Sequence, residues 1–288
     1  PMTTHVIGAG IAGLSAALHL LRAGHRVALH EAAPTAGGRA RALPDGTDNG
    51  THALLGANRA ALRFLDAIGA RDGWIEPEPA GLPVLDLADG TARRVALSPL
   101  AWGNAARRPT GLTPRGLAAL LRLALPGAER TVASVFARHP ALLRGLVEPL
   151  TVAALNTPAE EASARTLAAV VRRLGAPGAA RLYVAARGLG PDLVAPALAT
   201  LACHGMVFRH GARLRGITRA GNRAAALDFA EDSVELEDGD SAVLALPPWE
   251  AARLLPSLDV PTAHAPILNL HFAHAGEGPV RFIGLLGG

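Results

Sequence analysis

Three glycines and one glutamate near the N-terminus have the spacing of a dinucleotide-binding motif. Gly8, Gly10 and Gly13 follow a short apolar run and open a stretch with helical periodicity. Gly8 would permit a tight turn, Gly10 would let the backbone approach a pyrophosphate, and Gly13 would let the helix pack close to the strand. Glu31 stands 18 residues after Gly13, near the distance at which such motifs place an acidic residue. A glycine triplet alone is weak evidence, but this order of strand, helix and acid predicts a dinucleotide site.

The same segment supplies groups for two parts of that ligand. The free amides of Ile11 and Ala12, at the start of the helix, would face the pyrophosphate. Glu31 would accept hydrogen bonds from both hydroxyls of a ribose, and its charge would repel a 2′-phosphate. We therefore expect a dinucleotide whose adenosine ribose carries no phosphate. The alternative is a glycine-rich turn that holds no ligand.

A second glycine-rich segment follows Glu31. Gly37 and Gly38 would let this loop fold back over the dinucleotide, and Arg39 would donate two hydrogen bonds to its phosphates. We expect Gly38, like Gly10, to be a position where the backbone approaches the ligand closely.

Hydrophobic periodicity places these residues on a βαβ unit. Strands are expected over 5–7 and 26–30, with a helix over 11–22 between them. The rest of the chain predicts a helix over 60–68, strands within 81–97, a helical block over about 113–173, and a helix over 192–204. Short strands are expected over 206–208, 214–217, 224–229, 233–236 and 242–246, followed by a helical turn over 249–255 and two strands over 267–272 and 280–286.

Composition excludes several classes of protein. Half of the 288 residues are hydrophobic and 18% are charged, so general disorder is excluded. Lysine is absent and all 28 basic residues are arginine, which excludes Schiff-base chemistry and the P-loop lysine. Aromatic residues make up 3%, the net charge is +4, and no dense basic stripe is present, so we expect no nucleic-acid partner.

Cysteine usage and hydropathy bear on where the protein works. Cys203 is the single cysteine, cannot form an intrachain disulfide, and is interpreted as a small buried apolar residue. No window reaches the roughly 18 uninterrupted apolar residues of a membrane-spanning helix. We expect a cytoplasmic protein, or one bound peripherally at the inner face of a membrane.

The motif segments resemble a known superfamily of flavoproteins. The run VIGAGIAGLSAALHL, then Glu31, then GGRAR is similar to the FAD-binding start of the amine-oxidase and phytoene-desaturase superfamily. The resemblance implies FAD as the cofactor. It also implies that the strand beginning at Leu214 meets the adenine, and that Ala32, Gly50 and Thr51 contribute to the cofactor site.

Three further segments resemble a narrower family, the squalene-associated FAD-dependent desaturases, also called hydroxysqualene dehydroxylases. They are DNGTHALLGAN (48–58), SVFARHPALLRGLVEPLTVAALNTPAEEASA (134–164) and ILNLHFAHAG (267–276). This resemblance implies reduction of hydroxysqualene to squalene in bacterial hopanoid synthesis. Three alternatives stay open: a carotenoid-type desaturase, an amine oxidase, and a chain without catalytic activity.

The resemblance implies an α/β fold in which a discontinuous Rossmann-type FAD domain contains an inserted mixed α+β substrate domain. We expect the FAD domain over 1–75 and 192–255, a mainly helical substrate domain over 76–191, and substrate-domain strands over 256–288. The resembled family continues beyond the position of Gly288 with a turn and helix that contact the flavin. For a shortened chain we expect weak flavin binding, little turnover and association into a homodimer.

Two residues are candidates for the catalytic chemistry. His52, in a glycine loop, would line the flavin or the substrate entrance, or else pin the loop by a hydrogen bond. Glu148, among apolar residues, would be an acid in an apolar cavity. Glu160 and Glu161 are interpreted as helix-start charges instead. His271 and His274 would point to opposite faces of a strand, so we expect no metal site.

Arginines punctuate the leucine-rich stretch 117–125. Arg115 and Arg122 are seven residues apart and share one face of the expected helix. Such a helix could lie on an anionic membrane surface. The alternative is a surface helix whose leucines belong to the core of the substrate domain. Both interpretations stay open.

Overall fold

The computed structural model describes residues 2–50, 52–123, 125, 129–272, 278 and 281–287. The chain forms two compact units, each assembled from separate segments. Unit 1 comprises Pro1–His52, Arg63–Trp74 and Ala185–His264, and unit 2 comprises Ala53–Leu62, Ile75–Val184 and Ala265–Gly288.

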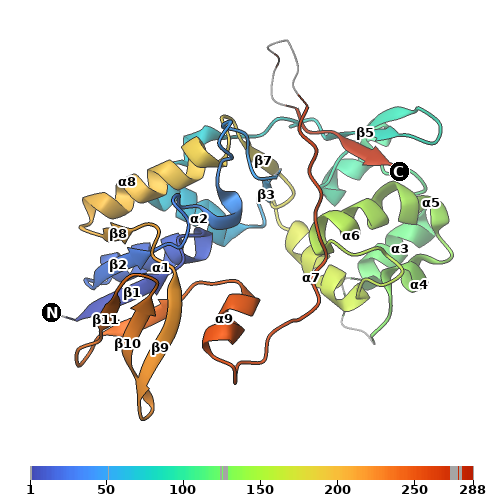
Figure 1. Ribbon diagram of the computed structural model, residues 1–288. Coiled ribbons are helices and arrows are strands. Elements are labelled where there is room, and N and C mark those ends of the chain that lie inside the picture. Colours follow the sequence, from blue (N-terminus) through green and yellow to red (C-terminus); the bar gives the residue numbers. More distant parts are fainter. Residues whose placement is uncertain are drawn as a thin grey trace. The chain divides into compact units, whose positions relative to one another are not determined.

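Unit 1 is built on a parallel sheet of strand order β12-β1-β2-β8, of which β1, β2 and β8 are labelled in Figure 1. Helix α1 (Ile11–Arg22) connects β1 to β2, and helix α8 (Ala195–Cys203) leads to β8. The four strands are β1 (Thr3–Ile7), β2 (Arg26–His30), β8 (Val207–Arg209) and β12 (Ser241–Leu244). Because β2 and β12 pair with opposite edges of β1, the chain leaves β1 at a topological switch point, where α/β sheets commonly bind ligands.

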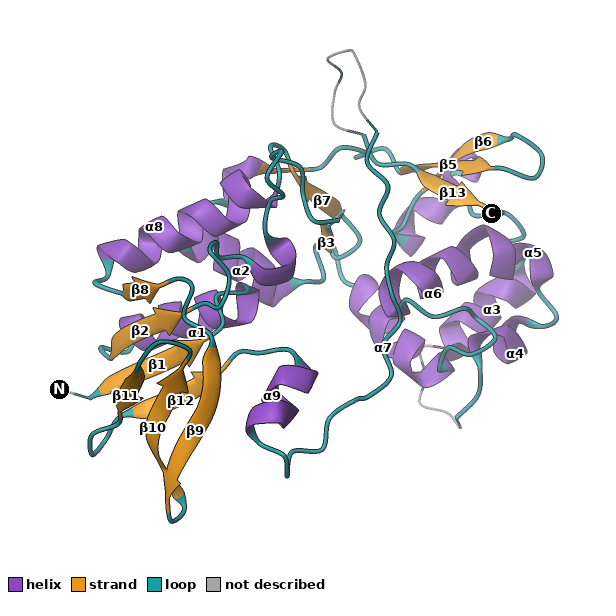
Figure 2. Cartoon of the chain, in the orientation of Figure 1, coloured by secondary structure: helices purple, strands orange, loops and turns teal. Residues whose placement is uncertain are grey.

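A three-stranded antiparallel sheet packs on the parallel sheet (Figure 2). It contains β9 (Leu214–Ala220), β10 (Arg223–Phe229) and β11 (Ser233–Glu235). Ile7 of β1 joins a buried cluster with Leu214, Leu227 and Phe229. The preceding residue of β1, Val6, is fully buried and points to the opposite face, because the side chains of a strand alternate. The end of β1 is therefore fixed from both faces.

Unit 2 combines short helices with a small sheet. The helices are α3 (Pro114–Leu123), α4 (Val132–Phe136), α5 (Pro140–Leu142), α6 (Glu148–Leu155) and α7 (Ala164–Leu174). Their core includes the fully buried side chains of Val132, Phe136, Leu142 and Leu167. The sheet has the order β13-β5-β6, with β5 (Leu82–Asp86), β6 (Ala92–Val95) and β13 (Gly284–Leu286).

The remaining elements are short. A fourth sheet has the order β3-β7-β4, formed by β3 (Ala53–Leu55), β7 (Leu182–Ala185) and β4 (Trp74–Ile75). Helix α2 spans Arg59–Ala67, and helix α9 spans Pro248–Leu254 after β12. A π-helical turn, Gly190–Val194, leads directly into α8.

Most expected elements are present, and the βαβ bounds of helix 11–22 and strand 26–30 are confirmed. The strand expected over 267–272 is wrong, since these residues form no strand and their apolar side chains are largely exposed. Of the strand expected over 280–286, only β13 forms. His271 therefore lies on no strand, and His274 lies outside the described residues.

The burial predicted for Cys203 is also wrong, since this residue is exposed at the end of α8. Ala197 and Leu201 are buried and lie four residues apart on one face of that helix. Cys203 stands two residues beyond Leu201, and therefore on the opposite face.

Unit 1 resumes at Ala185 and ends at His264, where the sequence predicted the FAD domain to resume at 192 and end at 255. The assignment of one unit to cofactor and the other to substrate stays a prediction.

Candidate functional site

A cavity of about 740 Å³ opens in unit 1 beside the carboxyl ends of β1, β2 and β12. Volumes of about 300–1,000 Å³ are typical of small-molecule sites. The lining residues come from the loop after β1, the start of α1, residues 31–33 after β2, the loop 37–41, residues 212–214, and the segment 245–250. The cavity therefore lies at the switch point of the parallel sheet.

The three motif glycines have three different geometric roles. Gly8 has φ +102°, and a Cβ there would lie 2.5 Å from the carbonyl oxygen of Ala245. A Cβ on Gly13 would lie 1.8 Å from the carbonyl oxygen of Gly8, so the helix can pack on the loop only with glycine at this position. A Cβ on Gly10 would meet no atom within 4 Å. Gly10 lines the cavity, so its missing side chain leaves room for a ligand rather than for the protein.

The first turn of α1 faces the cavity with free donors. Gly10 is the N-cap, no side chain caps the helix, and its first turn contains no acidic residue. The amides of Ile11 and Ala12 have no hydrogen-bond acceptor among the described residues, and both residues line the cavity. Unpaired amides at a helix N-terminus are an anion site.

Glu31 is held by four hydrogen bonds. Its carboxylate accepts from the amide of Ala9 at 2.7 Å and from the amide of Ala33 at 2.8 Å. Its backbone N–H donates to Arg209, and its carbonyl accepts from Ala212. A carboxylate has about four lone-pair positions, so two acceptor positions remain for ribose hydroxyls. The side chain is half-buried and lines the cavity, as such a role requires.

The loop 37–41 closes over the glycine loop. The Gly37 amide donates to the Ala9 carbonyl at 2.8 Å. Gly38 has φ +56°, and its Cβ would lie 3.1 Å from Cα of Gly10. Gly38 thus lets two backbone segments meet, as well as lining the cavity. Arg39 and Arg41 are exposed, line the cavity and have no ion-pair partner in the described part of the chain.

The far end of the cavity is formed by the start of β9 and by α9. Leu214 is almost fully buried and lines the wall. The Arg253 guanidinium donates to the carbonyls of Leu214 and Arg215, each at 2.8 Å. Trp249 also lines the cavity and is half exposed. Sequence reasoning missed Arg253 and Trp249, although the paired prolines before α9 marked the place.

The chain has clear relatives. The family model described as flavin containing amine oxidoreductase matches residues 11–282. A hydroxysqualene dehydroxylase of Rhodopseudomonas palustris is 39% identical over 99% of this chain and 72% of its own length. Another, from Zymomonas mobilis, is 36% identical over 99% of this chain and 72% of its own length. This chain belongs to the hydroxysqualene dehydroxylase family. It is therefore an FAD-dependent oxidoreductase.

Solved structures of other proteins have a fold similar to that of this hydroxysqualene dehydroxylase family member. An oxidoreductase from Methanosarcina mazei matches with a TM-score of 0.68 at 16% identity. The match covers 90% of this chain and 62% of the oxidoreductase. Putrescine oxidase bound to putrescine matches with a TM-score of 0.60 at 18% identity. This match covers 88% of this chain and 60% of the oxidase. At such low identity the likeness shows the fold alone. The predicted α/β flavoprotein fold is confirmed, and the chain spans less than two thirds of these solved proteins.

The cavity of this family member fits FAD. The open position at Gly10 and the free amides of α1 suit a pyrophosphate, and the guanidinium groups of Arg39 and Arg41 suit its charge. Glu31 suits an unphosphorylated ribose.

A buried histidine pair lies beside this cavity and was not singled out from the sequence. His30 is 1% exposed, lines the cavity and stacks on Phe229 with ring centroids 4.7 Å apart. His30 Nε2 and His5 Nδ1 are 3.1 Å apart. Burial, with the nearby His5 and Arg209, lowers the pKa of His30 to about 4, although Asp232 acts to raise it. His30 Nδ1 is buried without a partner in the described residues, so a ligand atom could satisfy it.

The other candidate residues are placed as follows. Ala32 is exposed and lines the cavity. Gly50 is buried and follows Asn49, a residue that lines the cavity. Thr51 lies outside the described residues. His52 is exposed and does not line the cavity, and Glu148 is the half-buried first residue of α6 in unit 2. Both stay predictions as catalytic residues.

Within the described ranges no three His, Cys, Asp or Glu side chains are grouped so that they could hold a metal ion. None of the helices in those ranges is long and apolar enough to cross a bilayer.

Proposed function

We propose that this protein reduces hydroxysqualene to squalene at a flavin held in unit 1, in bacterial hopanoid synthesis. The observation that carries the proposal is the match of 99–100% of the chain to relatives named hydroxysqualene dehydroxylase, at 35–39% identity. A zeta-carotene desaturase of Zea mays matches 25% of the chain. The match to the dehydroxylases is far more extensive, and it favours them over a carotenoid desaturase.

The proposed reaction balances with one hydride and one proton. The allylic C–O bond breaks, its oxygen leaves with a proton as water, and a C–H bond forms at the same carbon. Reduced FAD, when bound, would supply the hydride, which carries the two electrons of the reduction. Departure of an allylic oxygen is helped by delocalisation of the positive charge over the double bond, so the protein has to supply one proton donor and an apolar surrounding.

The chain's own residues hold the cofactor in this proposal. Glu31 accepts from the ribose, the α1 amides face the pyrophosphate, and Arg39 neutralises its charge. Glu148 is proposed as the proton donor, because it is half-buried and follows the buried Leu146 and Val147, and apolar surroundings favour the protonated acid. His52 is proposed to line the substrate entrance.

The substrate of this proposal is a long hydrocarbon alcohol that partitions into a bilayer. We therefore include contact with the cytoplasmic face of a membrane in the proposal. Self-association is included as well, because Ile267, Leu268, Leu270 and Phe272 expose most of their apolar surface to solvent. Light scattering tests this last element, and a monomer at micromolar concentration would contradict it.

Anaerobic incubation with hydroxysqualene tests the reaction. Protein with its flavin reduced by dithionite should yield squalene by mass spectrometry, and oxidised protein should yield none. A carotenoid desaturase would show the reverse dependence, with the oxidised flavin removing hydrogen from a hydrocarbon. Unchanged hydroxysqualene with fully bound, reduced flavin would contradict the proposal.

A further inference from the structure

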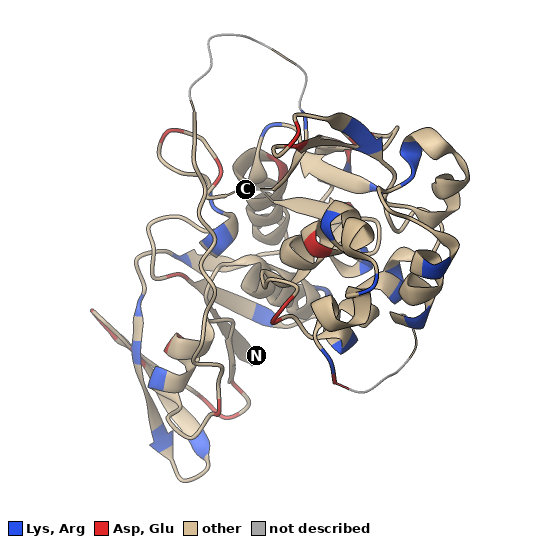
Figure 3. Cartoon of the chain, turned by 90° about the vertical axis from the view of Figure 1, so that its right-hand side faces the viewer, with Lys and Arg blue, Asp and Glu red and all other residues tan. Residues whose placement is uncertain are grey.

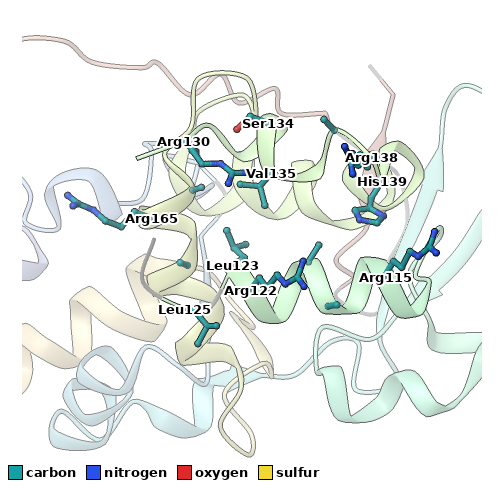
Figure 4. A pocket seen from close by; sticks show the side chains of 15 residues that line it. Arg115, Arg122, Leu123, Leu125, Arg130, Ser134, Val135, Arg138, His139 and Arg165 are labelled. Carbon is teal, nitrogen blue, oxygen red and sulfur yellow. The ribbon is translucent and has the colours of Figure 1, made fainter. Parts of the chain in front are cut away.

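A second cavity, of about 780 Å³, lies in unit 2 among helices α3, α4 and α7 (Figure 4). We name it the arginine cavity, because five arginines line it. Two come from α3, one precedes α4, one follows α4 and one belongs to α7: Arg115, Arg122, Arg130, Arg138 and Arg165. His139 lines the same cavity, and no Asp or Glu is among its lining residues.

The five guanidinium groups lack acidic partners. None of them forms an ion pair or side-chain hydrogen bond in the described part of the chain, although other arginines of unit 2 do. Arg144 pairs with Asp86 at 2.7 Å, and Arg94 pairs with Glu78 at 2.9 Å. In Figure 3 basic positions recur on the helices of unit 2, and acidic positions are few there. Unpaired guanidinium groups around one hollow favour an anion, and their planar donors match phosphate.

Exposed leucines lie on α3 and just beyond its C-terminal end. Leu117 and Leu121 of α3 are 39% and 63% exposed, and Leu125, two residues after the helix, is 64% exposed. Leu120 and Leu123, on a different face of the helix, are buried in the core of unit 2. Helix α3 therefore has a second apolar face that the described protein leaves in water. We name these three exposed residues the leucine stripe.

Phosphate recognition and apolar contact are combined on one helix. A soluble phosphate compound or a nucleic acid would use the arginines but would leave the leucines in water. An anionic phospholipid surface satisfies both, because its phosphates lie above an apolar layer. Contact from one side also agrees with a chain whose described helices are too short to span a bilayer.

We propose that the arginine cavity and the leucine stripe dock this protein on an anionic phospholipid bilayer. Arg115, Arg122 and Arg130 take lipid phosphates, and the leucine stripe enters the apolar layer. The surface gives a location to the membrane contact included in the proposed function, and in that sense rests on it. Its test needs neither flavin nor substrate, so the two proposals can fail separately.

Co-sedimentation with vesicles tests the arginines. The protein should bind vesicles of phosphatidylcholine with phosphatidylglycerol, bind pure phosphatidylcholine weakly, and release from the anionic vesicles as salt increases. The triple variant Arg115→Gln, Arg122→Gln, Arg130→Gln should bind anionic vesicles ~100-fold more weakly, since each arginine near such a surface contributes about fivefold. The matched control Arg26→Gln, Arg59→Gln, Arg63→Gln removes the same charge at exposed positions of α2 and β2 and should retain most binding.

The leucine stripe has its own readout. In a Cys203→Ser background, Leu121→Cys labelled with an environment-sensitive fluorophore should shift to the blue on addition of anionic vesicles. The same label at Leu258→Cys, an exposed leucine in unit 1, should not shift. All of these positions are exposed, so the variants are expected to fold, and circular dichroism checks this.

Four results would overturn the proposal. The first is no binding of the protein to anionic vesicles. The second is an equal loss of vesicle binding in the two triple arginine variants, which would show that binding depends on net charge alone. The third is binding of inorganic phosphate at the arginine cavity without vesicle binding, which would make it a site for free phosphate. The fourth is a dimer that Leu121→Gln converts to monomer while vesicle binding stays unchanged, which would make the stripe an interface between copies.

Discussion

The carboxylate of Glu31 accepts a hydrogen bond from the amide of Ala9 at 2.7 Å. This bond ties the end of β2 to the glycine loop after β1, because Ala9 lies between Gly8 and Gly10. Glu31 therefore has two tasks, which are to hold the loop in shape and to present its remaining lone pairs to a ribose.

Replacement of Glu31 should reveal both tasks. Glu31→Ala should weaken FAD binding by about 1–3 kcal/mol, and should lower the unfolding free energy of the flavin-free protein by a similar amount. Flavin titration measures the first effect and urea denaturation the second. Glu231→Ala, at an exposed position, serves as control. Flavin affinity unchanged in Glu31→Ala would contradict the ribose role.

Gly13 should be the glycine on which folding depends. In Gly13→Ala the new Cβ would lie 1.8 Å from a backbone oxygen, so the helix or the loop must move. We expect a loss of about 3 kcal/mol or more in unfolding free energy. Gly103→Ala, where a Cβ meets nothing within 4 Å, should change stability by less than about 0.5 kcal/mol. Equal stability of the two variants would show that the close approach at Gly13 is unimportant.

The glycine motif could be predicted from the sequence because the spacing of its glycines is set by the strand, turn and helix that contain them. The spacing predicted that Gly13 lets the helix pack closely, and a Cβ there would lie 1.8 Å from the carbonyl oxygen of Gly8. Gly10, predicted to let the backbone approach a pyrophosphate, lines the cavity, and that role stays a prediction. Gly38 was expected to approach the ligand, and it also approaches Gly10 itself. Such a contact between two loops depends on tertiary geometry, which periodicity does not report.

Protonation of His30 should cost stability in acid. Burial lowers its pKa from 6.5 to about 4, so the unfolded chain binds the proton more readily than the folded protein does. The contribution of this group is fully present above pH 6.5 and is lost progressively as the pH falls towards 4. Urea denaturation of the flavin-free protein should show unfolding free energy falling over this window.

In His30→Leu the unfolding free energy should depend less steeply on pH. Part of the dependence should remain, because burial also lowers the pKa of His5. His19→Asn, at an exposed position of α1, serves as control. A slope identical in His30→Leu and the unmodified protein would be inconsistent with a buried neutral His30.

Arg39 should act on the phosphates of the cofactor alone. Arg39→Met should weaken FAD binding roughly 10- to 150-fold, the range for a lost charge-assisted hydrogen bond. Binding of riboflavin, which lacks phosphate, should be unchanged. Arg59→Met, outside the cavity lining, should affect neither ligand. Equal weakening of FAD and riboflavin would indicate a general distortion of the site instead.

Other parts of the site could not be predicted from the sequence. His30 becomes notable only because His5 and Phe229 pack around it, and Arg253 because α9 folds back onto β9. A strand was expected over 267–272, yet these residues form none, and their apolar side chains are exposed. The two arginines of α3 were visible in the sequence, but the cavity that gathers Arg130, Arg138 and Arg165 beside them was not.

Equilibrium titration of Gly10→Val with FAD tests most directly whether the cavity of unit 1 holds the cofactor. A Cβ at this position meets no protein atom, so the flavin-free variant should unfold at the same urea concentration as the unmodified protein. Its added side chain should nevertheless occupy the pyrophosphate space and abolish FAD binding, whereas Gly103→Val should bind FAD as the unmodified protein does. Stoichiometric, equally tight FAD binding by Gly10→Val would contradict the site.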